Sequence, residues 1–170
     1  MKTIIVKPNG KQGQYGQVES LSAIELPLWA SILANYYKAD TIIDAEAENL
    51  SFGQLVERIQ QEKSDDCIIL GTGSHPSAHF QQRQDSMTLQ LALHKLNISS
   101  GIPCSLPVNP VQWTPPRLDL LPIEKYRAHN WLAWGYPSRS PYGAIFTSIG
   151  CPFSCQFCCI KEFLRGKFTL

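Results

Sequence analysis

The first hundred residues predict a doubly wound α/β domain, and three observations support that fold class. Short apolar runs of strand-like composition alternate with segments whose apolar residues recur at helical spacing. The strand-like runs are continuously apolar, which is typical of parallel strands covered on both faces. Their alternation with helices implies right-handed crossovers within one parallel sheet.

The first strand is expected over residues 3–6, and the turn signal Pro8-Asn9-Gly10 ends it. A helix follows, with Pro27 well placed as its first residue. Ser22 and Glu25 offer an alternative cap for a slightly earlier start. The apolar residues at helical spacing are Leu28, Trp29, Ile32, Leu33 and Tyr36.

A second strand is expected over residues 41–43, ending at Asp44. Ser51 and Gln54 then form a capping box at the start of the next helix. One apolar face of this helix is expected to contain Phe52, Leu55, Val56 and Ile59.

The third strand is expected over residues 67–70, with Cys67 as a buried core residue. It ends at Gly71-Thr72-Gly73, and another helix follows. A weaker fourth strand is expected around residues 102–106. The inner stripe of the intervening helix is expected to contain Leu89, Ala92, Leu93 and Leu96.

The composition changes after residue 100. Eight of the twelve prolines and three of the four tryptophans fall between Gly101 and Tyr142, which excludes long helices there. An extended connector is therefore expected, ordered by packing its aromatic residues on another part of the protein. Those aromatic residues are Trp113, Trp131, Trp134 and Tyr136. Strand-like sequence returns over residues 144–149.

Composition and charge exclude several classes of function. The chain has 170 residues and a net charge of +1, so no strong field attracts it to nucleic acid or to anionic lipid. No apolar run approaches the roughly 18 residues of a membrane helix, and no secretory signal is recognisable. We therefore expect a cytoplasmic protein, whose six cysteines are metal ligands or buried thiols rather than disulfides.

The segment from Cys151 to Cys159, here called the cysteine loop, is the most informative part of the sequence. The thiols of Cys151, Cys155 and Cys158 can converge on one centre, and thiolates select zinc, copper(I) or iron–sulfur centres. Zinc would require a fourth ligand. Small buried residues are the remaining alternative, and Cys159 is expected to pack beside the centre. Three thiolates on a four-iron cluster would leave one iron open to a small molecule.

Cys-x-x-x-Cys-x-aromatic-Cys after a strand resembles the signature of the radical S-adenosylmethionine (SAM) enzymes, with Phe157 as the aromatic residue. The resemblance implies a [4Fe-4S] cluster on Cys151, Cys155 and Cys158 whose open iron binds SAM, with Phe157 near the SAM. It also implies reductive cleavage of SAM with an electron from an external donor such as flavodoxin or ferredoxin. The spacing differs from that of ferredoxins.

The surrounding sequence is similar to radical SAM proteins with an N-terminal cobalamin (B12)-binding domain. The similar segments are residues 43–50, 71–78, 121–131 and 139–152. The resemblance implies a Rossmann-like, cobalamin-binding domain over residues 1–107, a connector over 108–142 and the start of a partial (β/α) barrel over 143–170. Cobalamin would lie at the carboxyl ends of the strands, as ligands do in open α/β sheets.

In that family the loops at residues 7–16, 45–48 and 71–78 would border the corrin. Gly71, Thr72, Gly73 and Ser74 are the expected cobalamin contacts, because small residues allow close approach of the backbone. These glycines are also ordinary turn residues. The Asp-x-His-x-x-Gly motif that supplies an axial ligand in many cobalamin proteins is absent. Cobalamin is therefore expected to bind without a protein imidazole.

Two departures from the family bear on activity. Three clear strands and one weak one precede the connector, where five are usual, and a (β/α) barrel needs on the order of two hundred residues. We therefore expect a truncated or internally deleted member, incomplete on its own and without independent turnover.

Three hypotheses follow. The first is a cobalamin-dependent radical SAM enzyme, or a fragment of one, for methyl transfer or radical rearrangement on an unidentified substrate. The second is an inactive α/β module that binds cobalamin or a partner and has a vestigial metal loop. The third is a small zinc protein.

Overall fold

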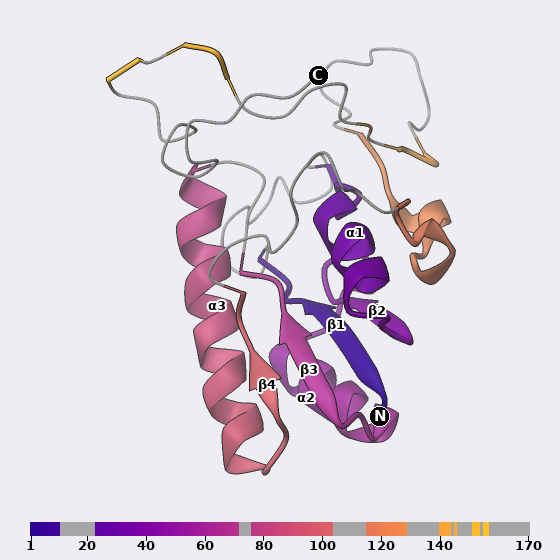
Figure 1. The fold of residues 1–170 in the computed structure, drawn as a ribbon, viewed down its shortest axis with the longest axis vertical. Helices are drawn as coiled ribbons and strands as arrows, with labels where there is room; N and C mark the ends of the chain where they lie inside the picture. The colour runs from indigo at the N-terminus through magenta and orange to yellow at the C-terminus, as the bar shows by residue number, and fades with distance from the viewer. Residues whose placement is uncertain are drawn as a thin grey trace.

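The computed structural model describes residues 1–10, 23–71, 76–103, 115–128, 140–143, 145, 151–153 and 155–156, with side chains of the helix at 76–95 described from Gln82 onward. The centre of this described part is a parallel sheet, and residues 151–153 and 155–156 of the cysteine loop lie on the side toward which its strands run (Figure 1).

The sheet has four described strands in the order β2-β1-β3-β4, and every pairing is parallel. Lys7 lies opposite Asp44 in the β1–β2 register, and Ile4 lies opposite Cys67 in the β1–β3 register. β1 therefore occupies the interior of the sheet with a later strand on each side. The strands are β1 (Thr3–Lys7), β2 (Thr41–Asp44), β3 (Asp66–Ile69) and β4 (Ser100–Gly101).

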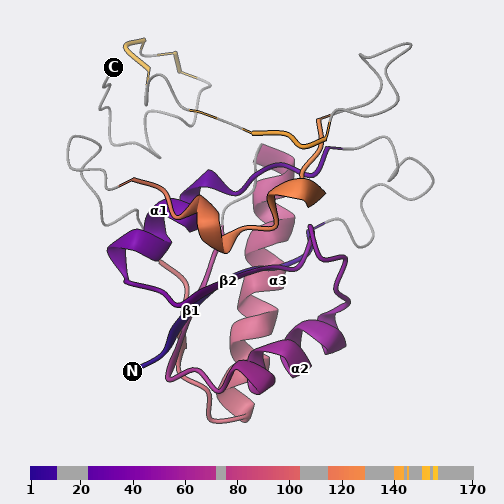
Figure 2. The same cartoon turned by 90° about the vertical axis from the view of Figure 1, so that its right-hand side faces the viewer.

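Helices cover both faces of this sheet. They are α1 (Leu28–Tyr36), α2 (Phe52–Glu62) and α3 (Pro76–Lys95). One core cluster joins α1 to alternate strand residues such as Ile5, Ile42 and Ile68. The other core cluster joins α2 and α3 to the intervening residues. α1 and α2 lie on opposite sides of the strands (Figure 2), so the doubly wound, Rossmann-like α/β prediction is confirmed at that level.

The first three strands match the prediction to within a residue at each end. The fourth strand lies two residues earlier than expected, because Ser100 and Gly101 pair with Cys67 and Ile68. Ile102 packs on the α2–α3 core, and Pro103 has no N–H to continue a ladder. Residues 104–106 of the expected strand lie outside the described residues.

The helix starts also follow the sequence. α1 begins at Leu28 with Pro27 at its N-cap, and the Ser51–Gln54 capping box begins α2. Three residues predicted on apolar helix faces are instead substantially exposed, namely Tyr36, Phe52 and Leu96. Each lies at or just beyond a helix end, where the sheet no longer covers the helical stripe.

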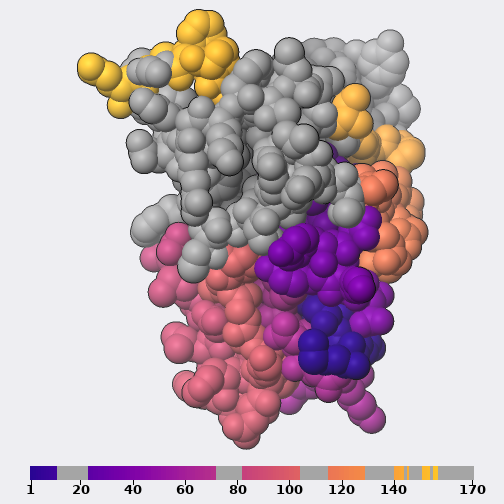
Figure 3. All heavy atoms as spheres, in the orientation of Figure 1, coloured from indigo at the N-terminus to yellow at the C-terminus, as the bar shows by residue number. Residues whose placement is uncertain are grey.

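Residues 115–128, here called the docking segment, pack beside α1. The segment contains two short 3-10 helices, η3 (Leu118–Leu120) and η4 (Ile123–Lys125). Arg117 N donates to Ser31 O at 3.0 Å, and Asn35 Nδ2 donates to Pro115 O at 2.7 Å. Figure 3 shows the segment against α1 on the molecular surface. The predicted connector aromatics at 113, 131, 134 and 136 lie outside the described residues.

Within the described parts of the chain, no helix is both long and apolar enough to cross a membrane.

Cys67 is fully buried on the α2–α3 face, as the sequence predicts, and this burial generates a test at alkaline pH. Burial, followed by the negative charge of Asp66, raises the pKa of the thiol from 9.0 to about 12. A raised folded-state pKa contributes stability that is present below the unfolded pKa and is lost as the pH rises. We expect the wild-type unfolding free energy to decrease above about pH 9, by up to ~1.4 kcal/mol per pH unit from this thiol.

Urea unfolding of wild type and Cys67→Ala at pH values from 7 to 10.5 measures this contribution. The Cys67→Ala curve should run parallel to wild type below pH 8, offset by the loss of packing, and should decrease less steeply above pH 9. Parallel curves over the whole range would contradict the prediction.

Candidate functional site

The carboxyl edge of the sheet, where β1, β2 and β3 end, is the candidate functional site. After β1 the chain leads to α1 on one face, and after β3 it leads to α3 on the other face. β1 and β3 are adjacent. The strand that follows β1 is added on one side of this pair and the strand that follows β3 on the other, so the strand order reverses between them. Ligands of open α/β sheets bind outside the carboxyl ends of strands at such a switch point.

Lys7 and Asp44 form a buried ion pair at this edge. They are the last residues of neighbouring parallel strands and lie in register. Side-chain alternation places them on the α1 face, with Ile5 and Ile42 before them. Lys7 Nζ lies 3.4 Å from Asp44 Oδ1 and 2.8 Å from Glu46 Oε2.

Asp44 also shapes the turn that follows β2. Its Oδ1 accepts hydrogen bonds from the backbone N–H groups of Glu46 at 3.1 Å and Ala47 at 3.2 Å. Ala45 N donates to Lys7 O at 2.9 Å, which extends the β1–β2 pairing into the turn. The turn therefore holds Glu46 within reach of Lys7.

Tyr126 of the docking segment completes the network. Its hydroxyl donates to Asp44 Oδ2 at 3.1 Å, and its side chain is fully buried in the α1 core. Asp44 is also fully buried, and the Lys7 side chain is 11% exposed. A buried carboxylate thus has partners on both of its oxygens, which offsets the cost of removing it from water.

The electrostatics hold Lys7 charged and Tyr126 neutral around neutral pH. Burial alone would lower the pKa of Lys7, but the carboxylates of Asp44 and Glu46 outweigh it, and the pKa lies above its ordinary value. Burial and then the charge of Asp44 raise the pKa of the Tyr126 hydroxyl. Lys7 therefore stays charged and Tyr126 stays neutral, so the cluster orients groups rather than transferring protons.

Gly71, the first of the predicted cobalamin contacts, lies at this edge, separated from the end of β3 by Leu70. A Cβ at Gly71 would lie 3.0 Å from Ile102 Cγ2 and 3.9 Å from the Ser86 side chain. The space beside this glycine is therefore filled by the protein's own core, which gives the glycine a packing role. The other predicted contacts, Thr72, Gly73 and Ser74, lie outside the described residues.

Side chains of α3 bind the loops that follow β1 and β3. Gln82 Nε2 donates to Pro8 O at 3.1 Å, and the single Ser86 hydroxyl proton is shared between Leu70 O at 3.1 Å and Gln82 O at 2.7 Å. Both polar side chains are buried. They fix α3 to the two strand ends that border the switch point.

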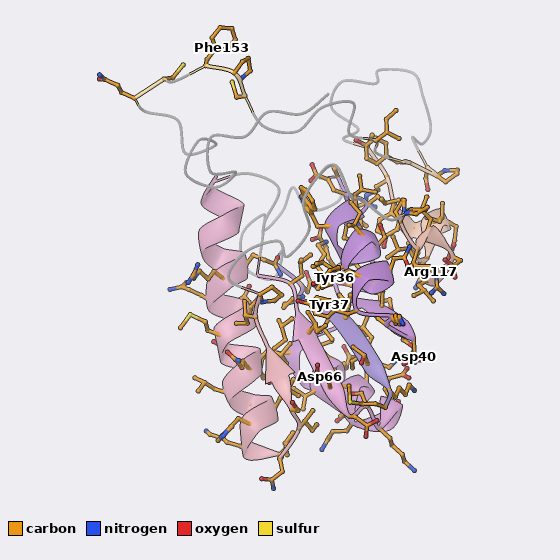
Figure 4. All side chains as sticks on the ribbon, in the orientation of Figure 1. Tyr36, Tyr37, Asp40, Asp66, Arg117 and Phe153 are labelled. Carbon is orange, nitrogen blue, oxygen red and sulfur yellow. The ribbon has the colours of Figure 1, made fainter. Side chains whose placement is uncertain are left out.

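Two of the three predicted cluster cysteines are described. Cys151 is half-buried and Cys155 is exposed, and both are free thiols. Phe153 between them is exposed and points away from the sheet (Figure 4). Cys158 and Phe157 lie outside the described residues, and no group of three metal-binding side chains occurs among the residues that are described.

The sequence placed Lys7 and Glu46 in loops expected to border the corrin, but it singled out neither of them, nor Tyr126, as an individual site residue. A signal existed for the Lys7–Asp44 ion pair, because each of these charged residues ends an otherwise apolar strand. Tyr126 gave no comparable signal, because its partner Asp44 is 82 residues earlier in the chain.

Comparison with known proteins gives one partial match. A 43-residue segment is 44% identical to an uncharacterized methyltransferase of Pyrococcus horikoshii. The match covers 25% of this chain and 7% of that protein's length. No protein-family model matches the sequence, and no solved structure matches it.

Replacing Asp44 with alanine tests the network. The change leaves the Tyr126 hydroxyl and two backbone N–H groups without their acceptor and removes one of the two carboxylates beside Lys7. Breaking a buried ion pair in this way costs about 3 kcal/mol. We expect that loss of unfolding free energy in urea titrations of Asp44→Ala. Glu57→Ala, on the exposed side of α2, should change it by less than about 0.5 kcal/mol. A loss below ~1 kcal/mol in Asp44→Ala would contradict the prediction.

Gly71→Ala tests the packing role of this glycine near the end of β3. Because the new methyl group would press on Ile102, we expect a destabilisation of about 1 kcal/mol. In the Ile102→Ala background, Gly71→Ala should lower the free energy of unfolding by less, because the Ile102 Cγ2 methyl group is no longer present. Equal costs in the two backgrounds, measured by thermal unfolding, would show that Ile102 does not restrict this position.

Proposed function

We propose that this chain contributes to a cobalamin-dependent radical SAM enzyme. In this proposal Cys151, Cys155 and Cys158 bind a [4Fe-4S] cluster, and the carboxyl edge of the α/β sheet faces cobalamin. The reaction is reductive cleavage of SAM, driven by an external one-electron donor such as flavodoxin or ferredoxin, and leads to methyl transfer or radical rearrangement.

The cysteine spacing is the observation that carries the proposal. Three thiols within eight residues leave one iron of a four-iron cluster without a protein ligand, which is the position that SAM would occupy. The residues present fit such a cluster, because Cys151 and Cys155 are free thiols that keep contact with solvent. Thiolates are the ligands that iron–sulfur clusters require.

The sheet supports the cobalamin part of the proposal through its topology. A doubly wound sheet presents its switch point at the carboxyl edge, and residues 151–153 and 155–156 of the cysteine loop lie on that same side (Figure 1). Bound cobalamin would supply a methyl carrier or a radical partner. The chain's own contribution would be orientation, because Asp44 fixes the turn at residues 45–48 and α3 fixes the loops after β1 and β3.

The name of the Pyrococcus relative describes a methyltransferase, and methyl transfer is one of the two reaction types proposed. The match is short, so the proposal rests on the cysteine loop and not on that name.

A cluster assay tests the proposal. After anaerobic reconstitution we expect about four irons and four sulfides per chain, a visible absorbance that dithionite bleaches, and a change in that spectrum on adding SAM. Cys155→Ala should reduce the iron content to background, because it removes one of three ligands. Cys159→Ala is the matched control and should retain the cluster, because its neighbour Cys158 is the proposed ligand.

Unchanged iron content in Cys155→Ala would contradict the proposed ligand set. Zinc in place of iron would favour the small zinc protein, and no metal in a folded chain would favour the inactive α/β module with a vestigial loop. Cobalamin is tested separately, by titrating hydroxocobalamin into the metal-free chain and following its visible spectrum.

A further inference from the structure

Tyr126 has no role in the chemistry proposed above, yet it makes hydrogen bonds both to the carboxyl edge of the sheet and to the chain that precedes the cysteine loop. Its side chain reaches the carboxyl edge, where the hydroxyl donates to Asp44 Oδ2. Its backbone carbonyl accepts a hydrogen bond from Tyr142 N at 3.1 Å. One residue therefore contacts both the sheet and the chain that leads into the cysteine loop.

The cysteine-loop approach, defined as residues 140–143, is held to the docking segment at further points. Ser140 Oγ donates to Glu124 O at 2.9 Å. The Tyr142 side chain packs on the same α1-face core that buries Tyr126. The approach is thus attached at Ser140 and Tyr142. Tyr142, the nearer of the two to the cysteine loop, lies nine residues before Cys151.

The docking segment is in turn fixed to the α/β domain along its length. Ile24 and Arg127 exchange backbone hydrogen bonds of 2.9 and 3.1 Å, directly after Tyr126. Leu121 is buried in the same core. Inside that core, the hydrogen bond from the Tyr126 hydroxyl to Asp44 Oδ2 joins two fully buried side chains.

We propose that Tyr126 is a positioning residue that sets the cysteine-loop approach relative to the carboxyl edge of the sheet. The inference rests on the proposed function for its two cofactors, the cluster in the cysteine loop and cobalamin at the carboxyl edge of the sheet. The linkage itself depends only on the hydrogen bonds described. Two reacting cofactors must be held in a fixed geometry, and this linkage holds the approach, at Tyr142, to the carboxyl edge of the sheet, at Asp44.

Tyrosine suits this role chemically. Its ring fills the α1-face core, and its hydroxyl offers a neutral donor to a carboxylate that already pairs with Lys7. A phenylalanine would preserve the ring and leave Asp44 Oδ2 with one donor fewer. Tyr126→Phe is therefore the smallest change that separates linkage from packing.

The experiment is amide hydrogen exchange, by mass spectrometry or NMR, on the metal-free full chain. The reporters are Glu46 and Ala47, whose N–H groups bind Asp44, and Tyr142, whose N–H binds Tyr126 O. In Tyr126→Phe we expect all three to exchange about tenfold faster, while Ile5 and Ile68 in the sheet change by less than about threefold. Tyr37→Phe is the matched control, because Tyr37 packs on the same core, and it should leave the reporters unchanged.

Uniform acceleration of sheet and reporter amides in Tyr126→Phe would overturn the proposal, because it is the signature of an ordinary core residue. Acceleration at residues 46 and 47 with no change at Tyr142 would also overturn it, because the approach would then be positioned independently.

A second variant needs no change in the core. Ser140→Ala removes the surface hydrogen bond to Glu124 O, and we expect Tyr142 to exchange faster and the half-buried Cys151 thiol to react about threefold faster with iodoacetamide. Unchanged exchange and labelling would count against the linkage. Neither measurement requires a cluster, so failure of iron binding and failure of this inference are distinguishable.

Discussion

The buried carboxylate of Asp44 is the constraint on which the carboxyl edge of this protein depends. It accepts hydrogen bonds from a strand neighbour, from two backbone groups of its own turn and from Tyr126. A buried charge with fewer partners would be too costly to retain. The requirement to satisfy this one group therefore holds β1, β2, the turn after β2 and the docking segment in a single arrangement.

This arrangement gives the proposed chemistry a rigid platform rather than reacting groups. Lys7 remains charged and Tyr126 neutral, so neither can exchange protons with a substrate near neutral pH. Any reactive power would come from the groups that the chain binds, which is the usual division of labour in cofactor enzymes. Under that proposal the protein's part would be to place the cysteine loop and the sheet edge with respect to each other.

The sequence predicted much of the fold because local signals suffice for it. Continuous apolar strands, the Ser51–Gln54 capping box and Pro27 each specify local structure without reference to distant residues. The candidate site depended on pairings that local patterns do not encode. Lys7 meets Asp44 only through the parallel register, and Tyr126 meets it only because the docking segment returns over α1. The position of β4 was shifted for a similar reason, since pairing with β3 fixed it at Ser100 and Gly101.

The sheet order also has a consequence for how the chain folds as it is synthesised. β1 precedes β2 and β3 in the chain but pairs with both, so its apolar residues remain unpaired until these later strands are synthesised. Each of these waiting strands carries a charge at one end, supplied by Lys7, Asp44 and Asp66. Charges that flank apolar strands oppose their premature association. In the nascent chain the residues that later form the ion pair would thus act as gatekeepers against aggregation.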